Sequence, residues 1–290
     1  MQRRINKVAV LGSGVMGSRI ACHFANIGVQ VLLLDIVPRE LTPDEEKKGL
    51  TLESKHVRNR IVNTALQAAI NSNPSPLYRK SHARLIQTGN FEDNMKEIAT
   101  ADWTIEVVVE NLKIKKTVFD QVEQHRKPGT LITSNTSGIP IHMMLDGRSD
   151  DFRKHFCGTH FFNPPRYLKL LEIIPTPETD QSVVDFLMHY GDLYLGKTTV
   201  LAKDTPAFIA NRVGIYAIMQ GLQVMNKLGL IVDEVDRISG PIIGRPKSAT
   251  FRTLDVVGLD TLANVANGLY QTGEKDESRE LFKLPDYLQQ

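Results

Sequence analysis

Short apolar runs alternate with amphipathic helical segments from the start of the chain to about residue 202. The first run, residues 7–11, is short and β-branched, as a buried parallel strand requires. In the segment after it, Met16, Ile20 and Phe24 recur every four residues and therefore share one helix face. A second apolar run follows and ends at Asp35. This order predicts a strand–helix–strand unit with parallel strands.

The same alternation continues beyond this first unit. Further strands are expected at residues 85–88, 103–109, 131–133, 155–162, 168–174 and 196–202. From residue 203 onward the pattern predicts only helices, at residues 207–228, 233–238, 249–257 and 260–270. We therefore expect an α/β fold: a doubly wound, Rossmann-type sheet over residues 1–202, followed by an all-α domain over residues 203–290.

Residues 38–84 interrupt the alternation and predict a helical insertion in the first domain. Thr42 is expected to cap a helix that begins at Pro43, with acidic residues in its first turn. A second helix is expected to run to Ile70, with one apolar stripe made of Val57, Ile61, Ala65, Ala68 and Ala69.

Composition limits the classes of partner. Hydrophobic residues make up 41% of the chain, charged residues 23%, and the formal net charge is +2. This balance gives no reason to expect nucleic acid or a membrane surface as a partner. No apolar run is long enough to span a bilayer, and the first strand follows the N-terminus without room for a signal peptide. Cys22 and Cys157 lie in apolar elements, as buried thiols of a reducing compartment would, so we expect a cytoplasmic protein.

The loop after the first strand reads Gly12-Ser-Gly14-Val-Met-Gly17. Gly12 would permit the tight turn, Gly14 would leave room for a pyrophosphate, and Gly17 would let the helix pack on the strand. Asp35 follows Gly17 at close to the sequence distance expected for the acid that binds a ribose. The alternative is a structural turn without a ligand, but strand, glycines, helix and acid together favour a dinucleotide site. The expected cofactor-binding residues of this unit are Gly12, Gly14, Val15, Met16, Gly17 and Asp35.

Four later polar residues together suit one reaction: Ser137, His160, Glu172 and Asn211. Each alone has a structural explanation: a turn, a core histidine, an ion pair or a backbone contact. Oxidation of a secondary alcohol needs a base for the hydroxyl proton, which histidine can supply near neutral pH. A carboxylate would hold its second nitrogen, and a hydroxyl and an amide would hold the substrate oxygen. A nicotinamide would take the hydride.

These motifs resemble the L-3-hydroxyacyl-CoA dehydrogenases of fatty-acid β-oxidation. The resemblance rests on the glycine loop and on the segments at residues 109–115, 134–137, 160–164, 169–172, 203–212 and 254–260. It implies that His160 is the general base, that Glu172 orients it, and that Ser137 and Asn211 bind the 3-oxygen and thioester region of an acyl-CoA. It also implies NAD as the cofactor, with Asp35 on the adenosine ribose. Three further positions would line the NAD site, namely Glu110, Lys115 and Asn163. No metal site is expected.

Three departures from the family bear on partners. The helical insertion is hard to match, so no CoA-binding lysine is carried over. Residues 244–252 resemble the branch in which the dehydrogenase is fused to an enoyl-CoA hydratase module. The Gly-x-Gly-Phe-Tyr motif that usually ends the family's helical domain is absent. We therefore expect a truncated helical domain from a longer polypeptide, in which the mostly polar residues after Tyr270 cover the apolar face of the bundle poorly. The alternative is a natural short variant that has lost the last helix.

The resemblance also implies a homodimer that forms through the helical domain. The predicted helix at residues 207–228 carries apolar residues on more than one face, which fits that expectation. The sequence thus predicts NAD-dependent oxidation of (S)-3-hydroxyacyl-CoA to 3-oxoacyl-CoA. Two alternatives stay open: a related β-hydroxyacid or sugar-acid dehydrogenase, and a non-enzymatic, NAD-binding protein of the crystallin type.

Overall fold

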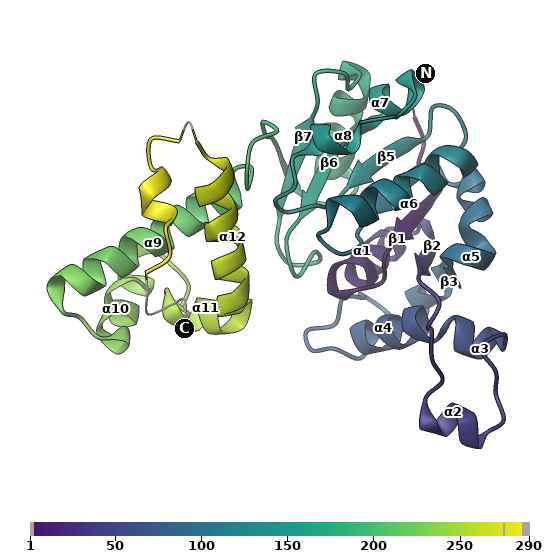
Figure 1. Cartoon of the computed structure of the whole chain (residues 1–290), viewed down its shortest axis with the longest axis horizontal. Helices are drawn as coiled ribbons and strands as arrows, with labels where there is room; N and C mark the ends of the chain where they lie inside the picture. The colour runs from purple at the N-terminus through teal and green to yellow at the C-terminus, as the bar shows by residue number, and fades with distance from the viewer. Residues whose placement is uncertain (1–2, 275, 286–290) are drawn as a thin grey trace. The chain divides into compact units, whose positions relative to one another are not determined.

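The computed structural model describes residues 3–274 and 276–285, drawn in Figure 1. The chain divides into two compact units, Met1–Asp204 (unit 1) and Thr205–Gln290 (unit 2). Unit 1 holds the sheet, and the regular elements of unit 2 in its described residues are all helices. The α/β class with an all-α second part is confirmed.

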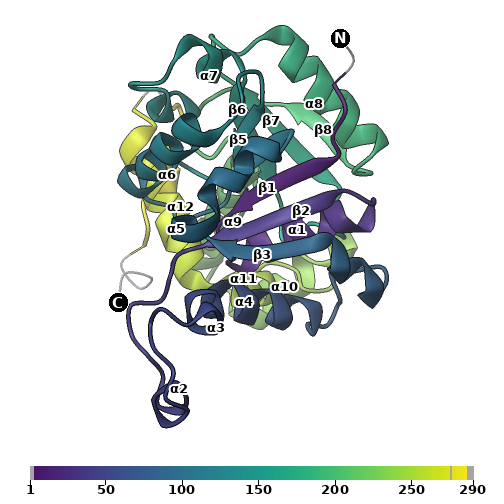
Figure 2. The same cartoon turned by 90° about the vertical axis from the view of Figure 1, so that its right-hand side faces the viewer.

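Unit 1 is built around one eight-stranded sheet with the order β3-β2-β1-β4-β5-β6-β7-β8. Figure 2 shows this sheet with β3, β2 and β1 side by side. The strands are β1 (Lys7–Leu11), β2 (Gln30–Asp35), β3 (Ile86–Asn90), β4 (Trp103–Glu106), β5 (Leu131–Ser134), β6 (Phe156–Phe161), β7 (Leu170–Pro175) and β8 (Thr198–Leu201). Every neighbouring pair is parallel except β6 and β7. The antiparallel β6–β7 pair is a hairpin, so the start of β7 lies at the same edge of the sheet as the end of β6.

The helices of unit 1 connect these strands. The α-helices are α1 (Val15–Asn26), α2 (Pro43–Lys47), α3 (Lys55–Arg58), α4 (Arg60–Ile70), α5 (Phe91–Asn94), α6 (Leu112–His125), α7 (Asp150–Lys154) and α8 (Gln181–Leu193). Short 3-10 helices lie at Lys80–Leu85, Met95–Thr100 and Ile141–Met144.

The two faces of the sheet are covered by different helices. Val8, Val10 and the alternate residues of β2 share a core with α1, α4 and α8. Trp103 of β4 joins that core by edge-on ring contacts with Phe24 and Tyr190. On the other face, the rings of Phe119 in α6 and Phe152 in α7 pack against Phe156 in β6. Burial on both faces explains why the strands read as continuous apolar runs.

The helical insertion forms, with one difference from its predicted pattern. Thr42 caps α2 as expected, in a reciprocal arrangement with Glu45. The expected single helix towards Ile70 is instead broken at Asn59 into α3 and α4. The buried residues of α4 are Val62, Leu66 and Ala69, so of the predicted stripe only Val57 in α3 and Ala69 in α4 are buried.

Unit 2 consists of α9 (Ala210–Leu228), α10 (Val232–Ile238), α11 (Phe251–Val257) and α12 (Leu259–Thr272), with 3-10 helices at Pro241–Ile243 and Arg279–Phe282. Helix α9 begins three residues later than predicted, because Ala207 and Phe208 both have positive φ values, 58° and 49°. A left-handed backbone cannot continue a right-handed helix. Asn211 therefore stands in the first turn of α9 rather than one turn into it.

The segment after Tyr270 is better packed than the sequence predicts. Leu281, Phe282 and Leu284 are buried with residues of α9 and α12 in the core of unit 2. The expectation that residues after Tyr270 cover the bundle poorly is therefore wrong for these three, while residues 286–290 lie outside the described part. On α9 itself, Val213, Val224 and Leu228 are exposed, in agreement with an apolar character on more than one face.

No helix in the described part of the chain is long and apolar enough to cross a membrane.

The packing of Phe282 generates a stability prediction. Phe282→Ala should lower the unfolding free energy of unit 2 by about 3–5 kcal/mol, because it leaves a cavity where a fully buried ring was. Glu280→Ala, on the same 3-10 helix but exposed, is the control and should change stability by about 0.5 kcal/mol or less. Thermal or urea unfolding measures both; equal melting curves for the two variants would contradict the packing described here.

Candidate active site

The candidate residues of unit 1 gather at the carboxyl edge of the sheet. Asp35 ends β2, and the glycine loop follows β1. Glu110 follows β4, Ser137 follows β5, and His160 lies near the end of β6. These strands are neighbours in the sheet, so their ends form one continuous row. In open α/β sheets this edge is where ligands bind.

The glycine loop has the shape that a dinucleotide site needs. Gly12 has φ +104°, and a Cβ built on it would lie 2.6 Å from the carbonyl oxygen of Val107. A Cβ on Gly17 would lie 1.8 Å from the carbonyl oxygen of Gly12, so α1 packs directly on the turn. A Cβ on Gly14, in contrast, would meet no atom within 4 Å. Gly14 therefore presents open backbone at the start of α1, where no side chain caps the helix.

Asp35 is tied to this loop. Its Oδ2 accepts hydrogen bonds from the backbone N–H of Ser13 (2.6 Å) and from the Ser13 hydroxyl. Its Oδ1 accepts from the N–H of Ile36. The carboxylate thus fixes the glycine loop relative to the end of β2, and it lies only partly buried beside the position expected for a ribose.

His160 and Glu172 form a buried pair across the β6–β7 hairpin. They are direct partners in the antiparallel register, and His160 Nδ1 lies 2.7 Å from Glu172 Oε2. His160 is 5% exposed and Glu172 is fully buried. Because a carboxylate only accepts hydrogen bonds, Nδ1 carries the proton and the lone pair falls on Nε2. This is the orientation that an acid–base histidine requires.

Glu110 holds the loop that carries Ser137. Its Oε1 accepts hydrogen bonds from the Thr136 hydroxyl (2.5 Å) and from the backbone N–H groups of Ser137 and Gly138 (3.0 Å each). Burial alone would raise the pKa of Glu110, but the positive charge of Lys115 and these hydrogen bonds outweigh it and lower the pKa below its ordinary value. The surroundings of Glu110 therefore favour its charged form.

Lys115 lies behind Glu110 and is 1% exposed. Its ammonium is 2.7 Å from Glu106 Oε1 and 3.3 Å from Glu110 Oε2, and it contacts the carbonyl oxygen of Val108. Glu106 is fully buried, and burial raises its pKa in spite of Lys115 and the Ser134 hydroxyl. The side chain of Lys115 therefore pairs with both glutamates, and contact between Lys115 and a cofactor stays a prediction.

The two amides of the predicted site are placed differently. Asn163 is exposed in the loop after β6, and its Oδ1 accepts a 2.6 Å hydrogen bond from Arg19 on α1. This contact brings the loop to the helix that begins at the glycine loop. Asn211 belongs to unit 2, so its grouping with the residues of unit 1 stays a prediction.

These residues fit a bound NAD. Open space at Gly14, an uncapped helix start and a carboxylate at the end of β2 are what its pyrophosphate and ribose require. Among residues 3–274 and 276–285, no three His, Cys, Asp or Glu side chains converge as a metal site would need.

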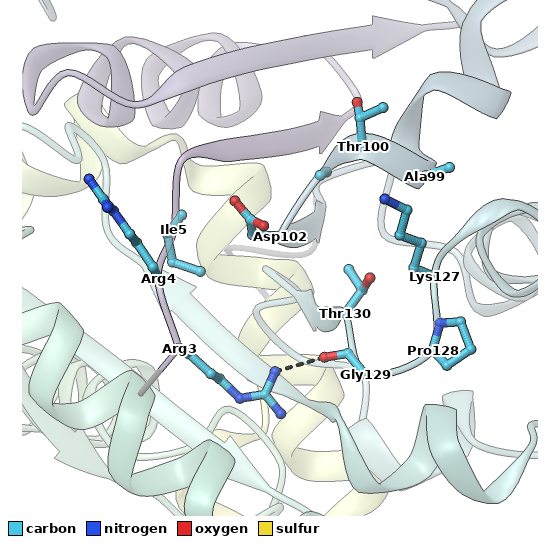
Figure 3. A pocket seen from close by; sticks show the side chains of 11 residues that line it. Arg3, Arg4, Ile5, Ala99, Thr100, Asp102, Lys127, Pro128, Gly129 and Thr130 are labelled. Atoms are coloured by element: carbon cyan, nitrogen blue, oxygen red, sulfur yellow. Dashed lines mark hydrogen bonds between the residues drawn. The ribbon is translucent and has the colours of Figure 1, made fainter. Parts of the chain in front are cut away.

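Two cavities lie at the opposite, amino-terminal edge of the sheet. The smaller, of about 270 Å³, is lined by residues that precede β1, β4 and β5, among them Arg3, Asp102 and Lys127 (Figure 3). In it Arg3 donates a 2.7 Å hydrogen bond to the carbonyl oxygen of Gly129. The larger, of about 790 Å³, lies between the N-terminal segment and α8. Neither contains a predicted site residue, so neither contributes to the candidate site.

Sequence reasoning missed several residues that position the site. Glu106 has the same signal that identified Glu172, an acid inside an apolar strand, and could have been found by it. Ser13 and Arg19 act through tertiary contacts that no local pattern reveals. Asn135 lies in the segment 134–137 that the sequence did single out, and its Oδ1 accepts from the N–H of Phe161 beside His160.

A sequence model of the 3-hydroxyacyl-CoA dehydrogenase NAD binding domain matches residues 7–205. A model of the 3-hydroxyacyl-CoA dehydrogenase C-terminal domain matches residues 208–288. The chain belongs to the 3-hydroxyacyl-CoA dehydrogenase family. The predicted resemblance is thereby confirmed, and so is NAD as the cofactor.

Relatives in the 3-hydroxyacyl-CoA dehydrogenase family cover nearly the whole chain. A probable 3-hydroxyacyl-CoA dehydrogenase of Bacillus subtilis is 56% identical over 288 residues, which are 99% of this chain and 36% of that protein. A probable 3-hydroxyacyl-CoA dehydrogenase of Deinococcus radiodurans is 43% identical over 94% of this chain and 75% of its own length. The chain thus spans about a third of the length of the Bacillus relative.

Solved structures with a similar fold include two that cover nearly the whole chain. A 3-hydroxybutyryl-CoA dehydrogenase from Escherichia coli is similar with a TM-score of 0.72 and 27% identity, over 99% of this chain and 56% of that chain. The structure of FadB2 from Mycobacterium tuberculosis has a TM-score of 0.78 at 24% identity, over 98% of this chain and 92% of that chain, and supports the fold.

The charge of Glu110 predicts a dependence of stability on pH. Because its pKa is lower in the folded chain, ionised Glu110 stabilises the fold above the ordinary glutamate pKa. That stabilisation is lost as the pH falls through the lowered value. Glu110→Gln should therefore lower the melting temperature at pH 7, and the difference from the wild type should shrink on acidification. Glu46→Gln, at an exposed position on α2, is the control; a difference that persists or grows in acid would refute the role of Glu110.

Proposed function

We propose that this chain oxidises (S)-3-hydroxyacyl-CoA to 3-oxoacyl-CoA with NAD. Membership of the family supports the reaction class, and one observation carries the chemistry: the buried pair of His160 and Glu172 at the edge where the glycine loop also lies. An isolated NAD-binding fold of the crystallin type would not need an oriented histidine beside its cofactor site.

In this proposal His160 Nε2 takes the proton of the substrate's 3-hydroxyl group. Glu172 holds Nδ1–H and stabilises the imidazolium that forms, so the tautomer is fixed before substrate binds. The Ser137 hydroxyl and the Asn211 amide hold the substrate's 3-oxygen and thioester region. When bound, NAD supplies the acceptor for the hydride that leaves the substrate carbon.

The cofactor would be held by the first strand–helix–strand unit. Backbone N–H groups at Val15 and Met16 in the first turn of α1 would face the pyrophosphate, and Gly12, Gly14 and Gly17 keep that approach open. Asp35 would bind the adenosine ribose. Glu110, Lys115 and Asn163 would complete the nicotinamide side, with Lys115 acting through Glu110.

His160→Ala tests the catalytic assignment. We expect kcat for NADH formation from a 3-hydroxyacyl-CoA to fall by about 10²–10⁴, the usual contribution of a positioned acid–base group. Glu172→Gln should also lower kcat, because the amide cannot stabilise the imidazolium as a carboxylate does. NADH binding, followed by its fluorescence, should survive in both variants.

Free 3-hydroxyacids are the control substrates for comparison with 3-hydroxyacyl-CoA. They should be oxidised poorly by the wild type if an acyl-CoA is the substrate, and well if a related β-hydroxyacid dehydrogenase is the correct reading. A His160→Ala variant that keeps wild-type kcat with 3-hydroxyacyl-CoA would disprove the assignment.

The position of Asp35 predicts a preference for NAD over NADP. A 2′-phosphate on the ribose would meet the carboxylate, and juxtaposed like charges cost several kcal/mol. The ratio of kcat/KM for NAD to that for NADP should therefore be at least about tenfold. Arg39, close to Asp35 in sequence, is the cation that would weaken this preference. Turnover with NADP equal to or better than with NAD would contradict the role of Asp35.

We further propose the setting of this activity. The name of a Rickettsia felis relative, a putative fatty acid oxidation complex trifunctional enzyme, supports a place in fatty-acid oxidation and further activities in the same polypeptide, of which an enoyl-CoA hydratase stays a prediction. The exposed apolar residues of α9 support a homodimer through unit 2. Cys22 and Cys157 are buried free thiols whose pKa values burial raises, which supports a reducing, cytoplasmic setting.

A further inference from the structure

Lys197, between α8 and β8, is a buried cation that the mechanism above does not use. It is 6% exposed, and no carboxylate of residues 3–274 and 276–285 forms an ion pair with it. Burial lowers its pKa to about 8, so near neutral pH it still carries its charge at a cost in desolvation. A buried charge that is not neutralised by an opposite charge needs some other compensation.

That compensation comes from one loop. The Lys197 ammonium donates hydrogen bonds to the backbone carbonyl oxygens of Pro165 and Leu168 (2.8 Å to the latter). It also lies 5.9 Å from the centroid of the Phe161 ring. Pro165 and Leu168 belong to residues 162–169, which we call the β6–β7 loop. These three contacts of the Lys197 ammonium therefore lie in the β6–β7 loop or in Phe161, the last residue of β6.

The titratable group that faces Lys197 from α1 is basic. His23 in α1 is buried, and its Nε2 lies 3.0 Å from the carbonyl oxygen of Leu195. Burial, and then the charge of Lys197, lower the pKa of His23 to about 4, so His23 is neutral near pH 7. Arg166 is the other cation that acts on His23. Near pH 7 the Lys197 ammonium is therefore charged among carbonyl oxygens, and the imidazole of His23 beside it is neutral.

The β6–β7 loop connects the strands that carry the catalytic pair. His160 precedes it and Glu172 follows it. The loop also makes hydrogen bonds to other segments. Asn163 accepts one from Arg19 on α1 (2.6 Å), and Arg166 donates to the carbonyl oxygens of Ser75 (2.7 Å) and Leu77 (2.8 Å). Of these hydrogen bonds to the loop, the one from Lys197 to Pro165 is buried.

We propose that Lys197 is a positioning residue: by holding the carbonyls of Pro165 and Leu168, it keeps the β6–β7 loop where Asn163 meets α1 on the cofactor side. This inference rests on the proposed function, because its effect is read through the affinity for NADH. The ammonium's three donors and its charge make the contact stronger than one neutral hydrogen bond.

Lys197→Met tests the proposal, because Met fills the same space without a donor. The NADH dissociation constant should rise roughly 10- to 100-fold, as expected for loss of hydrogen bonds to a charged group. The melting temperature should stay near that of the wild type, because the desolvation cost of the ammonium is removed with it. Lys154→Met makes the same chemical change at an exposed position on α7 and should leave both quantities unchanged.

A double-mutant cycle separates positioning from a general structural role. Asn163→Ala alone should also weaken NADH binding. If Lys197 acts through the loop, Asn163→Ala should add little in the Lys197→Met background. Fully additive effects would overturn the proposal.

The remaining outcomes are distinct. If the Lys197→Met variant binds NADH as well as the wild type does, the positioning role is wrong and the proposed function is unaffected. A wild type that does not bind NADH would overturn both. If Lys197→Met does not fold, Lys197→Gln, which keeps an uncharged donor, replaces it and should bind NADH with intermediate affinity. If neither folds, Lys197 is required for the fold and the proposal is wrong.

Discussion

The direction of the central strands is the constraint on which the site depends. Because β1, β4, β5 and β6 run parallel and adjacent, the residues that follow them meet along one edge. The hairpin from β6 to β7 then returns Glu172 to the same edge, directly opposite His160. Residues far apart in the chain become neighbours by this topology, and each strand end needs only one or two polar side chains.

Polar groups at this edge are held by side chains behind them. Glu110 accepts from the loop of Ser137, Lys115 supports Glu110, and Glu106 with the Ser134 hydroxyl supports Lys115. Such a network is costly when incomplete, since a buried charge without its partner is strongly destabilising. The arrangement therefore holds the Ser137 loop in one conformation more firmly than surface hydrogen bonds would.

Much of this could be predicted where the signal is local. The glycine loop, the capped start at Thr42 and most apolar runs depend on neighbouring residues, and they formed as expected. The strand expected at residues 103–109 is an exception, because β4 ends at Glu106. The break at Asn59 and the later start of α9 could not be predicted, because helical periodicity continues through both positions. The supporting roles of Arg19 and Lys197 depend on contacts between distant segments, so their sequence context carries no sign of them.

The two buried glutamates show how one sequence signal leads to two chemistries. Glu106 and Glu172 both interrupt apolar strands, and both are fully buried at the carboxyl edge. Glu106 faces a lysine, whose ammonium has no lone pair while charged and can only hold its partners in place. Glu172 faces an imidazole, which has a second nitrogen that can gain and lose a proton. A buried acid in a strand therefore indicates a charged partner, and the identity of that partner decides whether the pair supports structure or proton transfer.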